Sequence, residues 1–292
     1  MESIFGHKRI VYQLERAIKK DGVSQAYIFS GPQSVGKFTL AKAFAKRLIG
    51  NDNLDLTADY VLVEPETEEE KGKKRIKDIS VGKIRNFQRT LSITSGGRHK
   101  IAIINDAHRM TKSAQNALLK TLEEPSPGVV IILVTHDKNK LLPTIISRCQ
   151  VKKFGLLSRQ GLAEIAPTFS LNDEILVLAA GRPGFLIKMR DDQEELKNRQ
   201  EIISELKKII EYSVCEKFEA AESLSKNAPE MQEKMSAWIL FLRECLLKKE
   251  NRGKISQQKA LFLVDEINKS LEKLKETNAN AKLILENLFL KM

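Results

Sequence analysis

Apolar residues in the first half of the chain form short continuous runs, separated by stretches in which they recur three and four positions apart. The continuous runs are typical of buried strands and cover residues 26–30, 60–63, 100–104 and 129–135, and a further strand at residues 151–154 is predicted to close the sheet. The stretches between them, such as residues 8–20 and 111–122, have the spacing of amphipathic helices. Because strands that alternate with helices pair in parallel, residues 1–155 are predicted to form one α/β domain.

A charged tract interrupts this alternation at residues 64–77. Five glutamates in this tract precede five lysine and arginine residues. Blocks of opposite charge this close together are typical of a solvated loop or hairpin, which is the structure predicted here.

The pattern changes after residue 155, where only helical spacing remains. Helices are predicted over residues 160–166 and 172–180, and a third opens at Pro183, since proline suits the first turn of a helix. The chain is therefore predicted to comprise an α/β domain (1–155), a small helical domain (156–192) and an all-α domain (193–292).

The first strand leads into a glycine-bounded loop and then a helix. Gly31, Gly36 and Lys37 have the spacing of a phosphate-binding loop, in which backbone N–H groups and a lysine hold phosphate oxygens. The next residue in such loops is Ser or Thr, whose hydroxyl holds Mg²⁺, but here it is Phe38. Thr39 comes one residue too late, about 100° further around the helix. Nucleotide binding without efficient hydrolysis is predicted; a glycine turn that binds nothing and an active ATPase stay open as alternatives.

A second departure lies at the end of the strand over residues 100–104. Hydrolysing proteins with this loop carry an Asp for Mg²⁺ and a Glu that polarises water, whereas this chain has Asn105 and Asp106. Thr135 ends another strand, at the sheet edge where ligands of α/β proteins collect. Asp106 and Thr135 are therefore candidate nucleotide contacts, and the machinery for hydrolysis has two defects.

Composition and charge indicate which partners and which cell compartment to expect. The chain has 292 residues, a formal net charge of +11 and 6% aromatic residues. The charge favours proximity to DNA, and the few aromatic residues indicate no stacking platform for single strands. We find no signal peptide and no apolar run long enough for a membrane span, so a cytoplasmic protein without membrane contact is predicted.

Cysteine and histidine usage indicates no metal site. The three cysteines are widely spaced and odd in number, which argues against disulfides and zinc. The four histidines show no metal-ligand spacing: His7, His99, His108 and His136.

Two further segments carry a family resemblance. Residues 116–125, Asn-Ala-Leu-Leu-Lys-Thr-Leu-Glu-Glu-Pro, and the later Ser147-Arg148-Cys149 resemble the bacterial DNA polymerase III clamp-loader ATPases. The resemblance implies an AAA+ base domain, a small helical lid and a helical collar through which subunits form a ring. It implies that Arg148 enters a neighbouring subunit's ATP site as an arginine finger, and that Arg182 is the lid arginine that senses phosphate. From the residues alone, a surface arginine capping the preceding helix and a plain turn arginine are the alternatives.

Within this family, Phe38 and Asn105-Asp106 resemble the delta prime type more than the ATP-hydrolysing gamma/tau subunits. The expected function is to position ring subunits and supply the finger, so that a sliding clamp is loaded on primed DNA. Gamma/tau and delta subunits are the expected partners. No cofactor is expected to be required, and ATP or ADP is expected to bind without efficient hydrolysis. The alternatives are an active AAA+ ATPase, in which Lys37, Thr39 and Asp106 recruit Mg²⁺, and an adaptor that acts on a helicase. Many relatives carry a four-cysteine zinc module, but residues 50–75 contain no cysteine.

Overall fold

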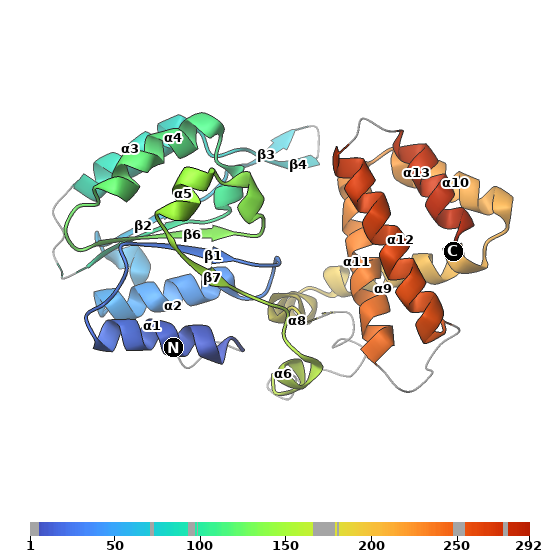
Figure 1. The fold of residues 1–292 in the computed structure, drawn as a ribbon, viewed down its shortest axis with the longest axis horizontal. Coiled ribbons are helices and arrows are strands. Elements are labelled where there is room, and N and C mark those ends of the chain that lie inside the picture. Colours follow the sequence, from blue (N-terminus) through green and yellow to red (C-terminus); the bar gives the residue numbers. More distant parts are fainter. Residues whose placement is uncertain are drawn as a thin grey trace. The chain divides into compact units, whose positions relative to one another are not determined.

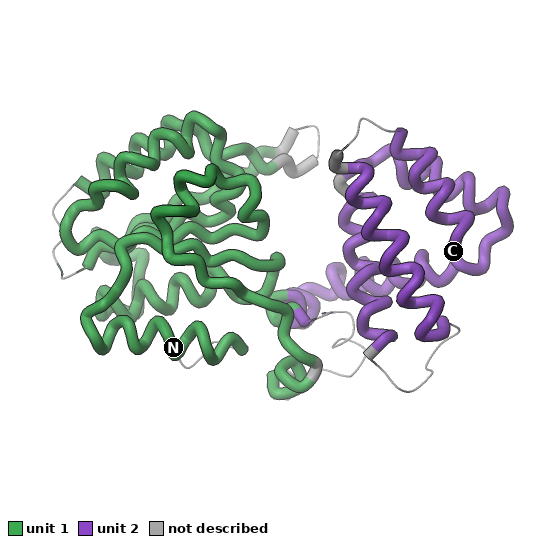
Figure 2. Tube along the Cα trace, viewed as in Figure 1, with its two compact units in different colours: residues 1–165, 182–184 green, residues 166–181, 185–292 purple. Residues whose placement is uncertain are grey.

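The computed structural model describes residues 6–70, 73–92, 97, 99–165, 179, 181–247, 255–276 and 280–292. The chain divides into two compact units (Figure 2). Unit 1 comprises residues 1–165 and 182–184, and unit 2 comprises residues 166–181 and 185–292. The three-domain division with boundaries at 155 and 192 stays a prediction.

Unit 1 is built on a parallel sheet with the strand order β2-β5-β6-β1-β7 (Figure 1). All neighbouring strands in it run parallel, as the alternation of strands and helices predicted. The strands are β1 (Ala26–Ser30), β2 (Tyr60–Val63), β5 (Lys100–Ile104), β6 (Val129–Thr135) and β7 (Gln150–Lys153). All seven residues of the central strand β6 are buried, which explains its unbroken apolar sequence.

Both faces of the sheet are covered by helices. Successive side chains of β5 point to opposite faces, so that Ile101 and Ile103 belong to one core, and Ala102 and Ile104 belong to the other. Helices α1 (Lys8–Lys19) and α2 (Lys37–Ile49) lie on the first face, and α3 (Val81–Ser92) and α4 (Lys112–Glu123) lie on the second (Figure 1). Thr111 caps α4 by accepting a hydrogen bond from the Ala114 N–H, which confirms the predicted start of that helix.

The charged tract forms an antiparallel hairpin, one of the two predicted structures. Strands β3 (Thr67–Glu70) and β4 (Lys73–Ile76) pair with each other and not with the main sheet. Lys77 forms an ion pair with Glu68, and Lys83 Nζ lies 2.8 Å from Glu66 Oε1. The opposite charges therefore meet across the hairpin and its flank.

Two short α-helices lie on either side of β7 in the sequence. Helix α5 (Pro143–Ser147) precedes β7, and α6 (Arg159–Ala163) follows it. The helix predicted over residues 172–180 lies outside the described residues, except for Ala179.

Unit 2 is helical in its described part, as predicted. Its helices are α8 (Pro183–Asp191), whose first two residues belong to unit 1, α9 (Gln193–Glu211), α10 (Val214–Ser225), α11 (Ala228–Leu247), α12 (Gln257–Glu276) and α13 (Ala281–Leu290). Trp238 lies fully buried in the core that α9 to α13 share, and its Nε1 donates a hydrogen bond of 2.8 Å to the Ile202 carbonyl. No helix among the described residues is long and apolar enough to cross a membrane.

Candidate functional site

The predicted site residues of the glycine loop and of two strand ends come together at one edge of the sheet. β1 and β6 are neighbours and pair Ser30 with Thr135, and β5 lies on the other side of β6. The carboxyl ends of these parallel strands therefore face the same edge, where ligands of open α/β sheets bind.

The glycine loop has the backbone that its sequence predicted. Gly36 has a φ of 92° and stands directly before α2, so that the loop ends at the N-terminus of this helix. Gly31 lies so close to β7 that an added Cβ would stand 2.2 Å from the Phe154 carbonyl oxygen. His7 also contacts this loop, because its Nε2 lies 3.0 Å from the Val35 carbonyl oxygen.

Lys37 is folded back onto the loop from which it starts. It is buried, and its Nζ donates hydrogen bonds to the carbonyls of Gly31 (2.8 Å) and Pro32 (2.5 Å). Burial lowers the pKa of Lys37 to about 8; the Asp106 carboxylate opposes this shift and the Arg182 guanidinium adds to it. A bound phosphate would offer this ammonium a stronger partner than two carbonyls do.

The two positions that usually supply Mg²⁺ ligands, at Phe38 and Asn105, carry an aromatic ring and an amide. The Phe38 ring is half-buried against the core under the loop, and Lys42 Nζ lies 4.7 Å from its centroid. Thr39 is exposed on α2. Asn105 Nδ2 donates a hydrogen bond of 2.9 Å to Glu64 Oε1. The position after the lysine therefore carries an aromatic ring, and the amide at the end of β5 is engaged with a neighbouring strand end.

Thr135, a candidate nucleotide contact, is fully buried. Its hydroxyl donates a hydrogen bond of 3.0 Å to the Asp137 carbonyl and accepts one of 3.1 Å from the Asp137 N–H. The hydroxyl thus shapes the turn after β6 in this conformation.

Arg182 lies on a segment that contacts the glycine loop, although it is far from the loop in sequence. The N–H of Gly184, two residues later, donates a hydrogen bond of 2.8 Å to the Ser34 carbonyl. The charge of Arg182 lowers the pKa of Lys37, so the two cations act on each other. Arg182 therefore lies near enough to Lys37 for their charges to interact, and its contact with phosphate stays a prediction.

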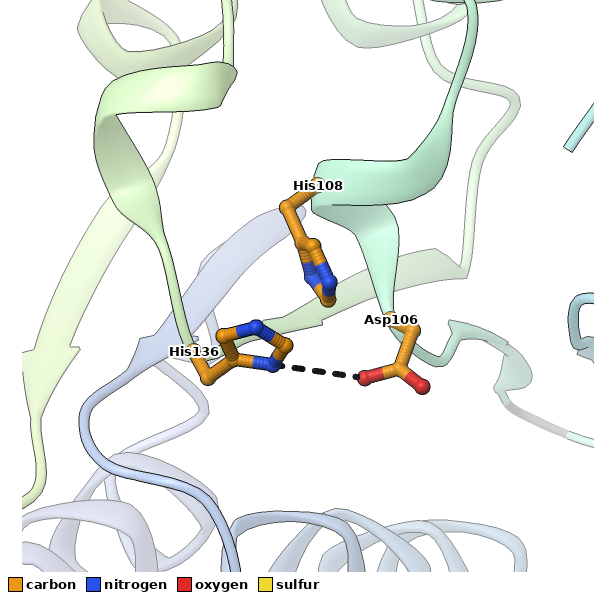
Figure 3. A group of neighbouring side chains, drawn as sticks. All are labelled: Asp106, His108 and His136. Carbon is orange, nitrogen blue, oxygen red and sulfur yellow. Dashed lines mark ion pairs between the residues drawn. The ribbon is translucent and has the colours of Figure 1, made fainter. Parts of the chain in front are cut away.

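Two histidines join Asp106 at the same edge, and the sequence did not indicate this. Asp106 and His136 point toward one another, and the His108 ring lies beside His136 (Figure 3). Asp106 Oδ1 lies 3.9 Å from His136 Nδ1, and the two imidazole centroids are 3.8 Å apart. His108 is separated from His136 by 28 positions in the sequence, so only the pairing of β5 with β6 shows that they meet.

In the described part of the chain, Arg148 makes its hydrogen bonds and ion pair with α5 and the end of α4, and not with the glycine loop or the two histidines. It follows α5 directly, and its Nη1 donates a hydrogen bond of 3.0 Å to the Thr144 carbonyl of that helix. Its Nη2 lies 2.6 Å from Glu123 Oε1, at the end of α4. The side chain is 35% exposed. The guanidinium therefore does bind the end of the preceding helix, as one sequence alternative held, and part of it stays open to a partner.

The sequence of this chain is similar to a known protein family. A family model described as "DNA polymerase III, delta subunit" matches residues 6–157, which is more than half of the chain. The DNA polymerase III subunit delta' of Pseudomonas aeruginosa is 28% identical over 305 residues, covering 91% of this chain and 90% of that protein.

Two shorter matches come from related proteins. The DNA polymerase III subunit tau of Bacillus subtilis is 31% identical over 176 residues, or 55% of this chain and 30% of that protein. The replication factor C small subunit of Haloarcula marismortui is 31% identical over 175 residues, or 60% of this chain. The chain spans about half the length of the Haloarcula protein.

Among solved structures, the Thermotoga maritima RuvB Holliday junction branch migration motor has the same fold. It is 15% identical with a TM-score of 0.50, over 97% of this chain and 89% of that one. This likeness agrees with an AAA+ α/β base followed by a helical C-terminal part. The chain therefore belongs to the family described as "DNA polymerase III, delta subunit", and it is an AAA+ clamp-loader subunit.

Proposed function

We propose that this chain is a clamp-loader subunit of the delta prime type, which does not hydrolyse ATP efficiently and supplies Arg148 to a neighbouring subunit's ATP site. Its partners are gamma/tau and delta subunits in a hetero-oligomeric ring, and the ring loads a sliding clamp on primed DNA. A cytoplasmic location follows from this role.

The observation that carries the proposal is a glycine loop at a helix N-terminus that lacks the usual metal ligands. Gly31, Gly36 and Lys37 support phosphate binding by their spacing and by the position of the loop before α2, while Phe38 stands in place of the hydroxyl and Asn105 in place of the carboxylate. Mg²⁺ prefers octahedral coordination by oxygen atoms, and an aromatic ring and an amide already engaged with Glu64 are poor substitutes. Binding of ATP or ADP without efficient cleavage is what this chemistry supports.

Arg148 supports the second half of the proposal. An arginine finger must project from its own subunit and reach a phosphoryl group from outside. Arg148 stands directly after the short helix α5 and is partly exposed, between Ser147 and Cys149. The delta prime and tau relatives make an assembly with other clamp-loader subunits the natural setting for it.

The first experiment measures ATP turnover by the purified chain. We expect no Mg²⁺-dependent turnover above that of a Lys37→Ala variant. Turnover that Lys37→Ala abolishes would instead support the rival function, an active AAA+ ATPase of the gamma/tau kind or an adaptor for a helicase.

The second experiment reconstitutes the ring with gamma/tau and delta subunits. Arg148→Ala should leave assembly of the ring intact and abolish ATP hydrolysis at the one neighbouring site that Arg148 enters. The reason is that an arginine finger accelerates hydrolysis by a factor of about 10³ to 10⁵. Arg85→Ala is the matched control, because Arg85 is an exposed arginine on α3 of the same unit. Equal rates for the two variants would contradict the role of Arg148 in trans.

A further inference from the structure

A carboxylate and two imidazoles meet at the edge of the sheet, beside the glycine loop. Asp106, His108 and His136 each offer one ligand atom, and the three atoms all lie within 4.8 Å of one another. Asp106 lies in the turn after β5, His108 lies in the short 3-10 helix that follows (Ala107–Arg109), and His136 directly follows β6 (Figure 3). Two neighbouring strands of the sheet therefore hold the group together.

The ligand set has a chemical preference. Imidazole nitrogen suits Zn²⁺, Co²⁺ and Ni²⁺, whereas Mg²⁺ prefers oxygen ligands and retains several waters. Two histidines and one carboxylate are also the three protein ligands of many zinc sites with an open position. This set is thus unlike the oxygen ligands that hold Mg²⁺ beside a phosphate-binding loop.

His108 provides an independent observation. Its side chain is buried, with a relative exposure of 7%, and its Nδ1 makes no hydrogen bond with the described part of the chain. A buried polar atom without a partner is costly, and a bound metal ion or its water is one way to satisfy it.

The charged side chains around the two histidines affect which metal ions can bind. Lys37, Arg109 and Lys140 act on the two histidines as nearby cations, and the carboxylates of Asp106 and Asp137 oppose them. An ion that binds chiefly through charge gains little in such surroundings. An ion that binds through imidazole coordination fits these surroundings better.

We propose that Asp106, His108 and His136 bind one first-row divalent transition-metal ion of the Zn²⁺ class, leaving one position open. Ligand atoms around tetrahedral Zn²⁺ stand about 3.4 Å apart, given metal–ligand distances of about 2.1 Å. The Asp106 and His136 side chains are each 38% exposed and can rotate to close the remaining distance, while the buried His108 stays in place. The site needs no nucleotide, so it stands or falls independently of the proposed function.

The test uses the full chain, stripped of metal with a chelator and titrated with Zn²⁺ and Co²⁺ by calorimetry and by visible absorption of Co²⁺. We expect one equivalent to bind, and His136→Gln and Asp106→Asn each to weaken binding by at least about tenfold. His99→Gln is the matched control, because His99 is half-buried in the same unit and lies outside the group, and it should bind as the parent does. Excess Mg²⁺ should leave the Co²⁺ spectrum unchanged.

Three results would overturn the site. They are equal affinity of the parent and His136→Gln, displacement of Co²⁺ by Mg²⁺, and loss of binding in Cys215→Ser, which removes an exposed thiol elsewhere in the chain. Circular dichroism of each variant checks folding, and His136→Gln changes a half-exposed side chain, so its loss of binding is not a loss of fold.

Discussion

Glu123 Oε1 lies 2.6 Å from Arg148 Nη2, so the arginine that we assign to a neighbouring ATP site is held by its own chain. Both side chains are partly exposed, and ion pairs of this kind contribute about 0–1 kcal/mol. The pair orders the guanidinium without binding it firmly.

Releasing Arg148 from Glu123 should therefore have a small effect. We expect Glu123→Gln to leave the ATPase rate of the reconstituted ring unchanged or to raise it by no more than about fivefold, the factor that corresponds to ~1 kcal/mol. The measurement is steady-state turnover with and without DNA. A loss as large as that of Arg148→Ala would show instead that Glu123 orients the finger during catalysis.

Restoring the absent oxygen ligands should restore dependence on Mg²⁺. The double variant Phe38→Ser with Asn105→Asp supplies a hydroxyl after Lys37 and a carboxylate at the end of β5. We expect Mg²⁺ to tighten its ATP binding by about tenfold, or ~1.4 kcal/mol, and to leave the affinity of the parent chain unchanged. Phe38→Leu controls for lost aromatic packing, and a Mg²⁺ effect in that control would contradict the prediction.

Nucleotide binding should depend on pH through Lys37. The pKa of this lysine is lowered to about 8 by burial, and a bound phosphate raises it because the charged form is favoured. Affinity is then constant below pH 8 and falls by at most about tenfold per pH unit above it, until the pKa of the complex is reached. A fluorescent ADP analogue titrated at pH 7, 8 and 9 tests this. Lys37→Met should bind weakly at every pH; a parallel slope in that variant would assign the pH effect to another group.

Acid should destabilise unit 1 of the metal-free chain through His108. Burial is the main cause that lowers the pKa of His108 from 6.5 to about 3, and the neighbouring His136 adds to it. Between pH 6.5 and pH 3, His108 is protonated in the unfolded chain but neutral in the folded chain. The free energy of unfolding therefore has its full value above pH 6.5 and falls as the pH drops from 6.5 toward 3. This one group contributes up to about 2 kcal/mol of loss between pH 7 and pH 5.

Urea unfolding of the parent and of His108→Gln at both pH values measures that contribution. The variant lacks the titrating ring and should lose less stability on acidification, whereas His99→Gln should behave as the parent does. An unchanged pH dependence in His108→Gln would contradict the assignment.

Most of the fold could be predicted because the hydrophobic pattern records burial directly. Strand β2 has the predicted bounds, and β6 proves central, since seven buried residues in a row leave no face for water. The hairpin of β3 and β4 was predicted only as one of two structures, because its charges are satisfied equally well in a loop.

The sequence predicted those parts of the site whose residues are close together in the chain. It did not predict contacts between residues that only strand pairing brings together. Gly31, Gly36 and Lys37 lie within seven residues, so their spacing alone predicted the loop. Asp106 and His136 meet because two strands lie side by side in a particular register, and no local spacing encodes this. The engagement of Thr135 with Asp137, and of Arg148 with Glu123, likewise depends on side-chain positions that a sequence does not display.

The hydrogen bond from Gly184 to Ser34 has a mechanical consequence. There is no room for a larger residue at position 184, since an added Cβ would stand 2.8 Å from the Ser34 carbonyl oxygen. A nucleotide that reshapes the glycine loop at Ser34 must therefore either carry Gly184 along or break this bond. The chain at the start of α8 thus reports the shape of the loop through a single backbone contact.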